Sequence, residues 1–222
     1  MKAIIEVSTQ EALYCDANLT LDAEGAYNPD TGTRDRQCNI VNCMLVTVAS
    51  KPADFAGRMY RLSAQGQLVR TSAGDAAAAA RLSQARESAW RAIQAQRERL
   101  SDTGGYKVAT LSGDKWFHSD LKSKLQQTRL AARAELIQAQ GGDLDTEFQL
   151  PPPLPADPLL WKTMDGSKVP MTPRLAMAVA AAAEATEILI FAVAEGHRAA
   201  MLQAADPLAY DYSAGWPAVY GG

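Results

Sequence analysis

The sequence predicts an α+β protein. A small, mainly β domain comes first, then a helix-rich domain with short β-hairpins and a long alanine-rich last helix. Three observations predict this class: short apolar segments between turn residues near the start, long helical segments later, and glycine pairs that end those segments. We expect a β-rich domain over residues 1–72, a connecting helix over 73–104, and a helix-rich domain with an aromatic tail over 105–222.

Short strands are predicted at the start of the chain. In residues 2–7, the side chains of Ala3, Ile5 and Val7 share one face of an extended segment, because successive residues of a strand point to opposite sides. Residues 13–21 predict further short extended pieces.

The remainder of the first domain alternates turns and strands. Residues 24–36 are rich in Gly, Asn, Asp and Pro, and predict a long loop. Residues 38–48 form the strongest predicted strand, which is apolar on both faces as central strands usually are. Residues 59–62 and 67–70 flank the sequence SAQG and predict a tight hairpin.

Three cysteines lie in this domain, at Cys15, Cys38 and Cys43, and their spacing matches neither a zinc knuckle nor a redox motif. In one extended strand, Cys38 and Cys43 would point to opposite faces. We interpret all three as small apolar core residues in a reducing compartment. A disulfide between Cys15 and one of the other two stays an open alternative.

The connecting helix is predicted from its cap and its composition. Asp75 is a suitable N-cap, the five alanines of residues 76–80 favour helix, and Gly104 and Gly105 end it. Apolar residues from Leu82 onwards recur at a spacing of three and four. The stripe is narrow, so we favour an amphipathic helix against its own domain over a coiled coil with other copies.

The third part begins with a hairpin and a helix. Residues 106–111 and 115–118 predict two strands around a turn at Ser112-Gly113-Asp114. Asp120 is placed to cap a helix over residues 121–140, which a glycine pair ends.

A proline-rich stretch separates this helix from the last elements. Residues 150–158 contain five prolines and predict a stiff, extended connector. Residues 159–163 and 168–171 surround the turn sequence MDGS and predict another hairpin. Pro173 suits the first turn of the last helix, which we expect to extend to residue 204 or 205.

Composition excludes several classes of function. The net charge of -3 and the pI near 5.5 argue against nucleic-acid binding, which needs a basic surface. Glu184 and Glu187 interrupt the most apolar window, residues 175–193, so we expect no membrane insertion. The start has no signal-peptide pattern, and we expect a protein made and kept in the cytoplasm or in a particle assembled there.

Candidate catalytic residues are few. His118 has Asp120 nearby as an orienting partner for acid–base work, but we favour a packed or capping residue at a strand-to-helix corner. His197 lies almost eighty residues away, so the two histidines make a poor metal set. Glu184 and Glu187 are expected on a solvated surface or in an interface ion pair, not in a metal site. With no known catalytic motif present, we expect no enzyme activity, no cofactor and no metal site.

Aromatic residues have a more informative placement. Three tryptophans, Trp116, Trp161 and Trp216, each stand beside a turn or a proline, and the last fifteen residues hold an aromatic cluster of Tyr210, Tyr212, Trp216 and Tyr220. Such a tail either docks on a neighbouring subunit, since Tyr and Trp dominate interface hot spots, or folds back over its own core. Both alternatives stay open.

Three segments occur in order along the second half of the chain: GDKWFHSD at residues 113–120 with Ser123, WKTMDG at 161–166 followed by VPMT at 169–172, and DPLAYDYSAGWP at 206–217. Together they resemble a C-terminal domain of uncharacterised function that occurs in tail proteins of tailed phages and prophages. The resemblance covers about residues 85–220, and the WKTxDG segment is its most specific part. No catalytic residues are carried over with it.

The resemblance implies a location in the phage tail. We expect a non-enzymatic structural or adaptor protein of a tail tip, baseplate or tail fibre, made in the host bacterial cytoplasm and retained in the virion. It would hold neighbouring tail proteins together and support host attachment, with residues 1–72 as an attachment module. Phage tails impose three-fold or six-fold symmetry, so we favour a homotrimer or another symmetric homo-oligomer. The residues expected to make contacts are Trp116, His118, Asp120, Trp161, Lys162, Asp165, Tyr210, Tyr212, Trp216 and Tyr220.

The sequence leaves two other functions to consider. A tail-fibre assembly chaperone would be absent from the finished particle and is the main alternative. A cell-wall or glycan hydrolase would need a pair of carboxylates in a cleft, and the spacing of acidic residues does not indicate one.

Overall fold

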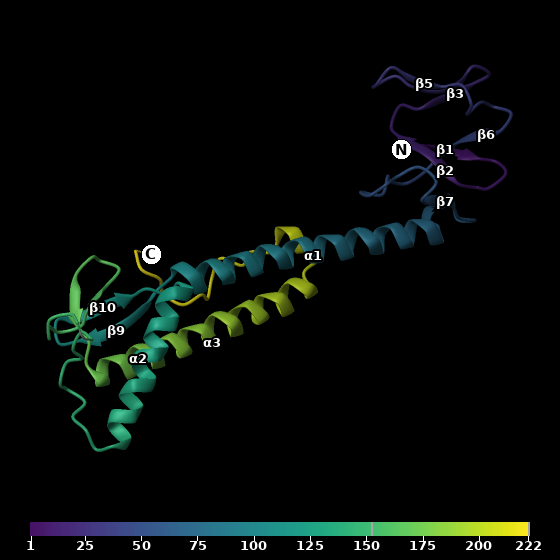
Figure 1. Ribbon diagram of the computed structural model, residues 1–222. Coiled ribbons are helices and arrows are strands. Elements are labelled where there is room, and N and C mark those ends of the chain that lie inside the picture. Colours follow the sequence, from purple (N-terminus) through teal and green to yellow (C-terminus); the bar gives the residue numbers. More distant parts are fainter. Residues whose placement is uncertain (152, 222) are drawn as a thin grey trace. The chain divides into compact units, whose positions relative to one another are not determined.

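The fold is α+β, as predicted. The computed structural model describes residues 1–151 and 153–221, so Pro152 of the predicted connector lies outside the described residues (Figure 1). The chain divides into two compact units, Met1–Gln84 and Ala85–Gly222. Helix α1 (Ser72–Thr103) begins in the first unit and ends in the second.

The N-terminal unit is built on strand β1 (Lys2–Glu6), which lies between β2 (Ala12–Asp16) and β6 (Cys43–Thr47) in an antiparallel sheet. Because residues of a central strand alternate between two covered faces, β1 contributes to two cores. One core consists of Ala3, Ile5, Ala12, Cys15, Val48 and Tyr60, and the other of Ile4, Leu19, Ala26, Cys38 and Cys43.

The prediction of a long loop over residues 24–36 is wrong. Strands β3 (Thr20–Asp22), β4 (Gly25–Asn28) and β5 (Thr33–Asp35) form a second antiparallel sheet there, and of the turn residues only Pro29, Asp30 and Gly32 lie in the short connection between β4 and β5. Gly25 belongs to a strand, where its φ is 130° and an added Cβ would lie 2.2 Å from the Asp35 carbonyl oxygen. This glycine permits close strand packing rather than a loop.

The predicted strand over residues 38–48 is also too long, because β6 begins only at Cys43. The side chain of Asn39 accepts a hydrogen bond from the Val41 backbone N–H at 2.9 Å, and that of Asn42 accepts one from the Asn39 N–H at 3.0 Å. These bonds hold a turn in place of a ladder, and they leave Val41 86% exposed. Moreover, β6 is an edge of its sheet, while the central strand is β1.

The three cysteines are buried free thiols, as their interpretation as core residues predicts. However, Cys38 lies in the turn before β6, so it does not point away from Cys43; the two Sγ atoms are 3.0 Å apart. Burial, followed by the neighbouring Cys43, raises the pKa of the Cys38 thiol to about 12.

A hairpin and a helix follow. Strands β7 (Tyr60–Leu62) and β8 (Leu68–Arg70) pair as predicted. Helix α1 begins at Ser72, earlier than expected, because the Thr71 hydroxyl accepts a hydrogen bond from the Gly74 N–H at 3.1 Å. Thr71 therefore takes the capping role predicted for Asp75, which lies in the first turn.

The C-terminal unit confirms the predicted order of elements. After α1 come two hairpins, two helices and a short 3₁₀ turn: β9 (Tyr106–Thr110), β10 (Gly113–Phe117), α2 (Leu121–Ala139), β11 (Leu160–Lys162), β12 (Lys168–Pro170), α3 (Pro173–Gln203) and η1 (Pro207–Ala209). Pro173 occupies the first turn of α3, and the Thr172 hydroxyl accepts a hydrogen bond from the Leu175 N–H at 3.2 Å.

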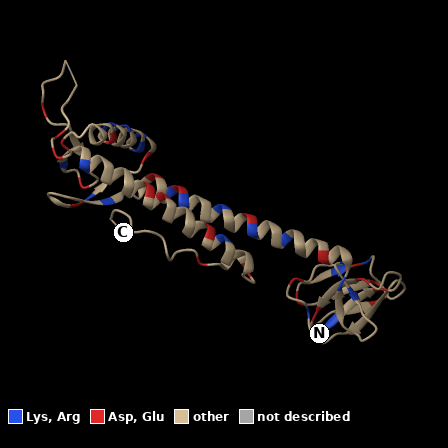
Figure 2. Ribbon diagram, turned by 90° about the horizontal axis from the view of Figure 1, so that it is seen from below, with Lys and Arg blue, Asp and Glu red and all other residues tan. Residues whose placement is uncertain are grey.

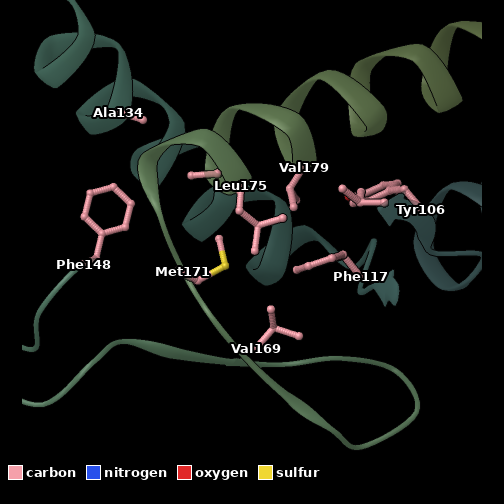
Figure 3. Packing of buried hydrophobic residues seen from close by; sticks show 10 residues of the cluster. Tyr106, Phe117, Ala134, Phe148, Val169, Met171, Leu175 and Val179 are labelled. Atoms are coloured by element: carbon pink, nitrogen blue, oxygen red, sulfur yellow. The ribbon is translucent and has the colours of Figure 1, made fainter. Parts of the chain in front are cut away.

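The main core of this unit lies where the two hairpins meet the start of α3 (Figure 3). Phe117 from β10 and Met171 after β12 are fully buried, and both lie beside the first turns of α3, near Leu175 and Val179. The buried members are Tyr106, Val108, Phe117, Ala134, Phe148, Val169, Met171, Leu175, Ala176 and Val179.

The proline-rich segment departs from its prediction. The Leu150 N–H donates to the Asp157 carbonyl oxygen at 2.9 Å, and Gln149 and Pro158 form an antiparallel bridge. The described residues between them therefore form a closed loop, not an extended connector. The reason is that the Leu159 N–H bonds to the Phe148 carbonyl at 2.7 Å, so both ends of the segment are held together at the core.

Charged residues of both signs are interspersed along α1 (Figure 2). The pair Arg91 and Glu87 lies one turn apart on its surface. This mixture is consistent with the low net charge of the chain.

Candidate interaction site

The first hairpin positions Trp116 and His118. Both follow Gly113, whose φ of 90° closes the turn between β9 and β10. His118 comes directly after the buried Phe117, and its carbonyl oxygen accepts a hydrogen bond at 2.9 Å from Nε2 of the buried Gln127. The backbone of His118 is thus fixed at the strand-to-helix corner, while its side chain stays half-buried.

Asp120 is the N-cap of α2, as predicted. Its Oδ1 accepts a hydrogen bond from the Ser123 N–H at 3.0 Å, and its Oδ2 accepts one from the Ser123 hydroxyl at 2.6 Å. These bonds lower the pKa of Asp120. The Asp120 carboxylate therefore caps α2, and this capping explains its position without any role in orienting His118.

Asp165 organises the turn of the second hairpin. Its carboxylate accepts hydrogen bonds from the Thr163 hydroxyl at 2.6 Å, the Ser167 N–H at 2.9 Å and the Ser167 hydroxyl at 2.7 Å. Its other oxygen accepts from Lys115 Nζ at 2.8 Å. Lys115 first, then Thr163 and Ser167, hold the pKa of the Asp165 carboxyl well below its ordinary value.

The two hairpins are joined by this ion pair and by the backbone. The Met164 N–H donates to the Trp116 carbonyl oxygen at 2.9 Å, beside the bond between Lys115 and Asp165. Gly105 allows this approach: its φ is 72°, and an added Cβ would lie 2.3 Å from Met164 Sδ. The GDKWFHSD and WKTMDG segments therefore form one assembly.

A groove with a volume of about 700 Å³ lies between the start of α2 and strand β11. It brings together four of the predicted contact residues, namely His118, Asp120, Trp161 and Lys162. The indole of Trp161 is half-buried and packs against the main core, whereas the Lys162 side chain is exposed.

The groove has an apolar wall and a basic rim. The wall consists of Leu130 of α2, Leu159 and Leu160, the first residue of β11, and Lys122 and Arg129 join Lys162 at the rim. Asp120 is the acidic residue of this lining, and its oxygens bond to the helix end. Such a surface suits an acidic partner with apolar side chains.

His197 holds the aromatic tail, a role that the sequence did not reveal. Its Nδ1 lies 2.9 Å from the Tyr210 hydroxyl and its Nε2 lies 2.9 Å from the Ala214 carbonyl oxygen. A carbonyl can only accept, so Nε2 donates, and in the neutral ring Nδ1 accepts from Tyr210. Trp216 lies with its ring centroid 5.4 Å from that of His197, and its Nε1 donates to the Tyr212 carbonyl at 2.7 Å.

The tail packs on helices α1 and α3 of its own unit. Tyr210, Tyr212 and Trp216 are half-buried against a small cluster formed by Ala89, Ile93, Ala194 and Met201. The guanidinium of Arg198 adds a cation–π contact, 4.8 Å from the ring centroid of Trp90. The second alternative for the tail, that it covers its own core, describes this arrangement.

The end of the tail reaches the first hairpin. The Tyr220 N–H donates to the Gly104 carbonyl at 2.9 Å, and its ring meets Trp116 edge-on, with 6.3 Å between centroids. The ten predicted contact residues thus fall into two groups. Seven lie around the hairpins and the groove, and three, Tyr210, Tyr212 and Trp216, lie around His197. Their contacts with a neighbouring subunit stay a prediction.

One polar junction joins all three helices. Glu187 of α3 accepts hydrogen bonds from the Ser101 hydroxyl of α1, at 2.7 and 2.9 Å, and lies 2.8 Å from Lys124 Nζ of α2. Glu187 is therefore in an ion pair within its own chain, whereas the sequence predicted a solvated surface or an interface ion pair. The identity of its partners could not be found from spacing along one helix.

Metal ligands do not gather in the part of the chain that the structure describes: no group of three or more His, Cys, Asp or Glu residues there could hold an ion. One protein family, described as a domain of unknown function (DUF4376), matches residues 84–214. Searches of curated proteins and of solved structures found no match. The matched region begins where the C-terminal unit begins and includes the groove and the first part of the tail, up to residue 214.

Proposed function

The chain belongs to the family of the domain of unknown function DUF4376, and on that premise we propose that it is a non-enzymatic structural protein of a bacteriophage tail. Its place would be the tail tip, the baseplate or the base of a tail fibre. There it would join neighbouring tail proteins as a symmetric homo-oligomer and support attachment to the host.

The observation that carries this proposal is that the three segments by which the sequence resembles a phage-tail domain lie in one compact unit, with the first two bonded to each other. Lys115 of the first segment bonds to Asp165 of the second, whereas the third packs on helices α1 and α3 of the same unit. A resemblance that was spread over separate stretches of sequence is thus concentrated in one compact unit. This is the expected result if the segments are parts of a single domain that is inherited as a whole.

The groove is the surface through which the unit would contact a neighbour. A half-buried indole with basic residues at its rim matches the composition of protein interfaces, where Trp and Arg supply much of the binding energy. The basic rim residues, Lys122, Arg129 and Lys162, favour a neighbour with an acidic surface. We propose that this neighbour is another tail protein.

Mass spectrometry of purified virions tests the location. We expect peptides of this chain in particles from a phage that encodes it, at a constant ratio to the tail proteins. A chain found in infected cells but missing from gradient-purified particles would contradict the proposal and favour the assembly chaperone.

Charge reversal in the groove tests the contact. We expect Lys162→Glu combined with Arg129→Glu to reduce incorporation into particles by about tenfold or more, because each reversal places like charges at the interface. Lys168→Glu is the matched control, since Lys168 is exposed on β12 and does not line the groove. Equal incorporation of the double variant and the control would show that another surface makes the contact.

A further inference from the structure

Helix α3 carries a large apolar face that its own unit leaves uncovered. Ile188, Leu189 and Phe191 are 60, 54 and 57% exposed. Its length and composition would allow the helix to cross a membrane, and only 17% of its most apolar 18-residue stretch is buried within the protein. Contiguous exposed apolar surface of this kind usually marks a site of interaction.

The exposed residues follow a heptad. Alanine recurs at every seventh residue, 178, 185, 192 and 199, and Ile188 and Leu202 belong to the second set, 181, 188, 195 and 202. Each residue of the first set is exposed. A sustained spacing of alternately three and four residues is the pattern of helices that pair along their length. The buried residues Val179, Ile190 and Ala194 lie elsewhere around the helix, against their own unit.

We propose that this face binds α3 of a second copy of the chain, with the two helices antiparallel. Charge complementarity between two copies identifies this occupant. Glu184 and Arg198 flank the apolar stripe on the same side, seven residues before and after Phe191. When two copies run in opposite directions about a two-fold axis near residue 190, Glu184 of each faces Arg198 of the other.

The same axis also places complementary apolar side chains of the two copies opposite one another. Phe191 would face Phe191 of the second copy on one flank, and Leu189 would face Leu189 on the other. Within the stripe, the large Ile188 would lie against the small Ala192, and Leu202 against Ala178. Alternation of large and small residues lets two helices approach closely without leaving cavities.

A parallel pairing is disfavoured by one residue of the stripe. In a parallel, in-register pair, Glu195 would face Glu195 of the other copy within an apolar stripe. In the antiparallel pair it lies opposite Ala185 and keeps its own Arg198, 3.4 Å away. The inference therefore favours a two-fold assembly over the three-fold one expected from the sequence.

A lipid bilayer is a less suitable occupant. Glu195 lies in the stripe and Glu184 and Arg198 lie at its edge, so insertion would bury charges in hydrocarbon. The opposite side of α3 is also held by the tail and by the junction at Glu187. The inference goes beyond the proposed function, because pairing through α3 can be measured on the purified chain wherever the protein acts.

Light scattering and sedimentation of the full-length protein test the pairing. We expect a dimer at about 100 µM and at least about a tenfold weaker association for Ile188→Glu, which places a charge in the stripe. Leu136→Glu is the matched control, because Leu136 is a 64% exposed leucine on α2. A monomeric native protein, or a dimer that Ile188→Glu leaves intact, would overturn the proposal.

Charge exchange tests the direction of the helices. Glu184→Arg and Arg198→Glu should each weaken the dimer, and the double variant should restore it, because the pairs reform with reversed signs. Circular dichroism shows that each variant is folded, which matters because Arg198 also contacts Trp90. Loss of the dimer in the double variant, with the fold intact, would contradict the antiparallel pairing.

Cross-linking gives an independent readout. With copper phenanthroline as the oxidant, Leu189→Cys should form a disulfide between copies, whereas Ala178→Cys should not, because residue 178 would face residue 202. The native thiols are buried and serve as the background. Efficient cross-linking of Ala178→Cys alone would show a parallel pair. Sedimentation of the native chain with phosphatidylcholine–phosphatidylglycerol vesicles, abolished by Ile188→Glu, would instead identify a membrane surface and overturn the proposal.

Discussion

Two regions of the C-terminal unit are held together by different means. The hairpin core, formed by β9–β10, β11–β12 and the first turns of α3, buries large side chains completely, Phe117 and Met171 among them. The aromatic tail, residues 206–221, leaves Tyr210, Tyr212 and Trp216 half-buried and depends on polar contacts to His197. Apolar burial is the larger contribution to stability, so we expect the tail to open locally while the core stays folded.

The largest expected effect is a cavity in the hairpin core. Phe117→Ala should lower the free energy of unfolding of the C-terminal unit by about 3–5 kcal/mol, because a fully buried ring is lost and its neighbours cannot fill the space. Chemical denaturation measures this. Leu111→Ala, at the exposed turn of the same hairpin, is the control and should change little. A small effect of Phe117→Ala would mean that the core is not the stable part of the unit.

Removal of the tail should have the next largest effect. A chain that ends at Ala205 exposes the cluster around Ile93 and Met201, and we expect the C-terminal unit to lose about 2 kcal/mol or more, the scale of uncovering one large apolar side chain. Assembly should weaken as well. Hydrogen exchange of residues 1–70 should not change, because the contacts of the tail lie within the C-terminal unit. Faster exchange in β1 would show that the tail also stabilises the N-terminal unit.

A smaller and local effect is expected from His197→Ala. Two hydrogen bonds to the tail are lost, each contributing about 0.5–1.5 kcal/mol. Hydrogen exchange should therefore accelerate over residues 208–217 and stay slow in β10. His118→Ala is the control, because the His118 side chain lines the groove and lies outside the tail cluster. If both variants loosen the tail equally, His197 is not what holds it.

The predictability of the two regions also differs, for physical reasons. Elements defined by local chemistry were found from the sequence: the cap at Asp120, Pro173 in the first turn of α3, and both hairpins of the C-terminal unit. Caps and turns join residues that are three or four positions apart, so both partners of each interaction can be identified within one short stretch of sequence. The groove could be foreseen only in part, because Trp161 and Lys162 reach His118 through the packing of two hairpins.

Long-range contacts explain what the sequence did not reveal. The tail path depends on His197, which lies thirteen residues before Tyr210 and on another element. In the N-terminal unit, strands β4 and β5 are hidden by their own turn residues, and Asn39 and Asn42 delay the start of β6 through bonds between side chain and backbone. Apolar periodicity describes which faces are buried, but it does not describe which partners bury them.

The smallest expected effect concerns the ion pair between Lys115 and Asp165, which acts as a clamp between the hairpins. Asp165→Asn removes the charge that pairs with Lys115, and near neutral pH we expect only a small loss of stability, because the carboxylate is 38% exposed and such pairs contribute little. The effect should depend on pH. Because the pKa of Asp165 is lowered in the folded state, its contribution is complete above the ordinary pKa of 3.8 and is lost as the pH falls below it.

Thermal unfolding between pH 6 and pH 3 measures this dependence. The melting temperature of the native protein should fall more steeply with acidification than that of Asp165→Asn, which has no carboxylate to protonate at this position. Lys115→Met should flatten the curve in part, because the amine is the largest cause of the lowered pKa while Thr163 and Ser167 remain. Parallel curves for the native protein and Asp165→Asn would mean that the clamp between the hairpins is held by the backbone bond from Met164 to Trp116 alone.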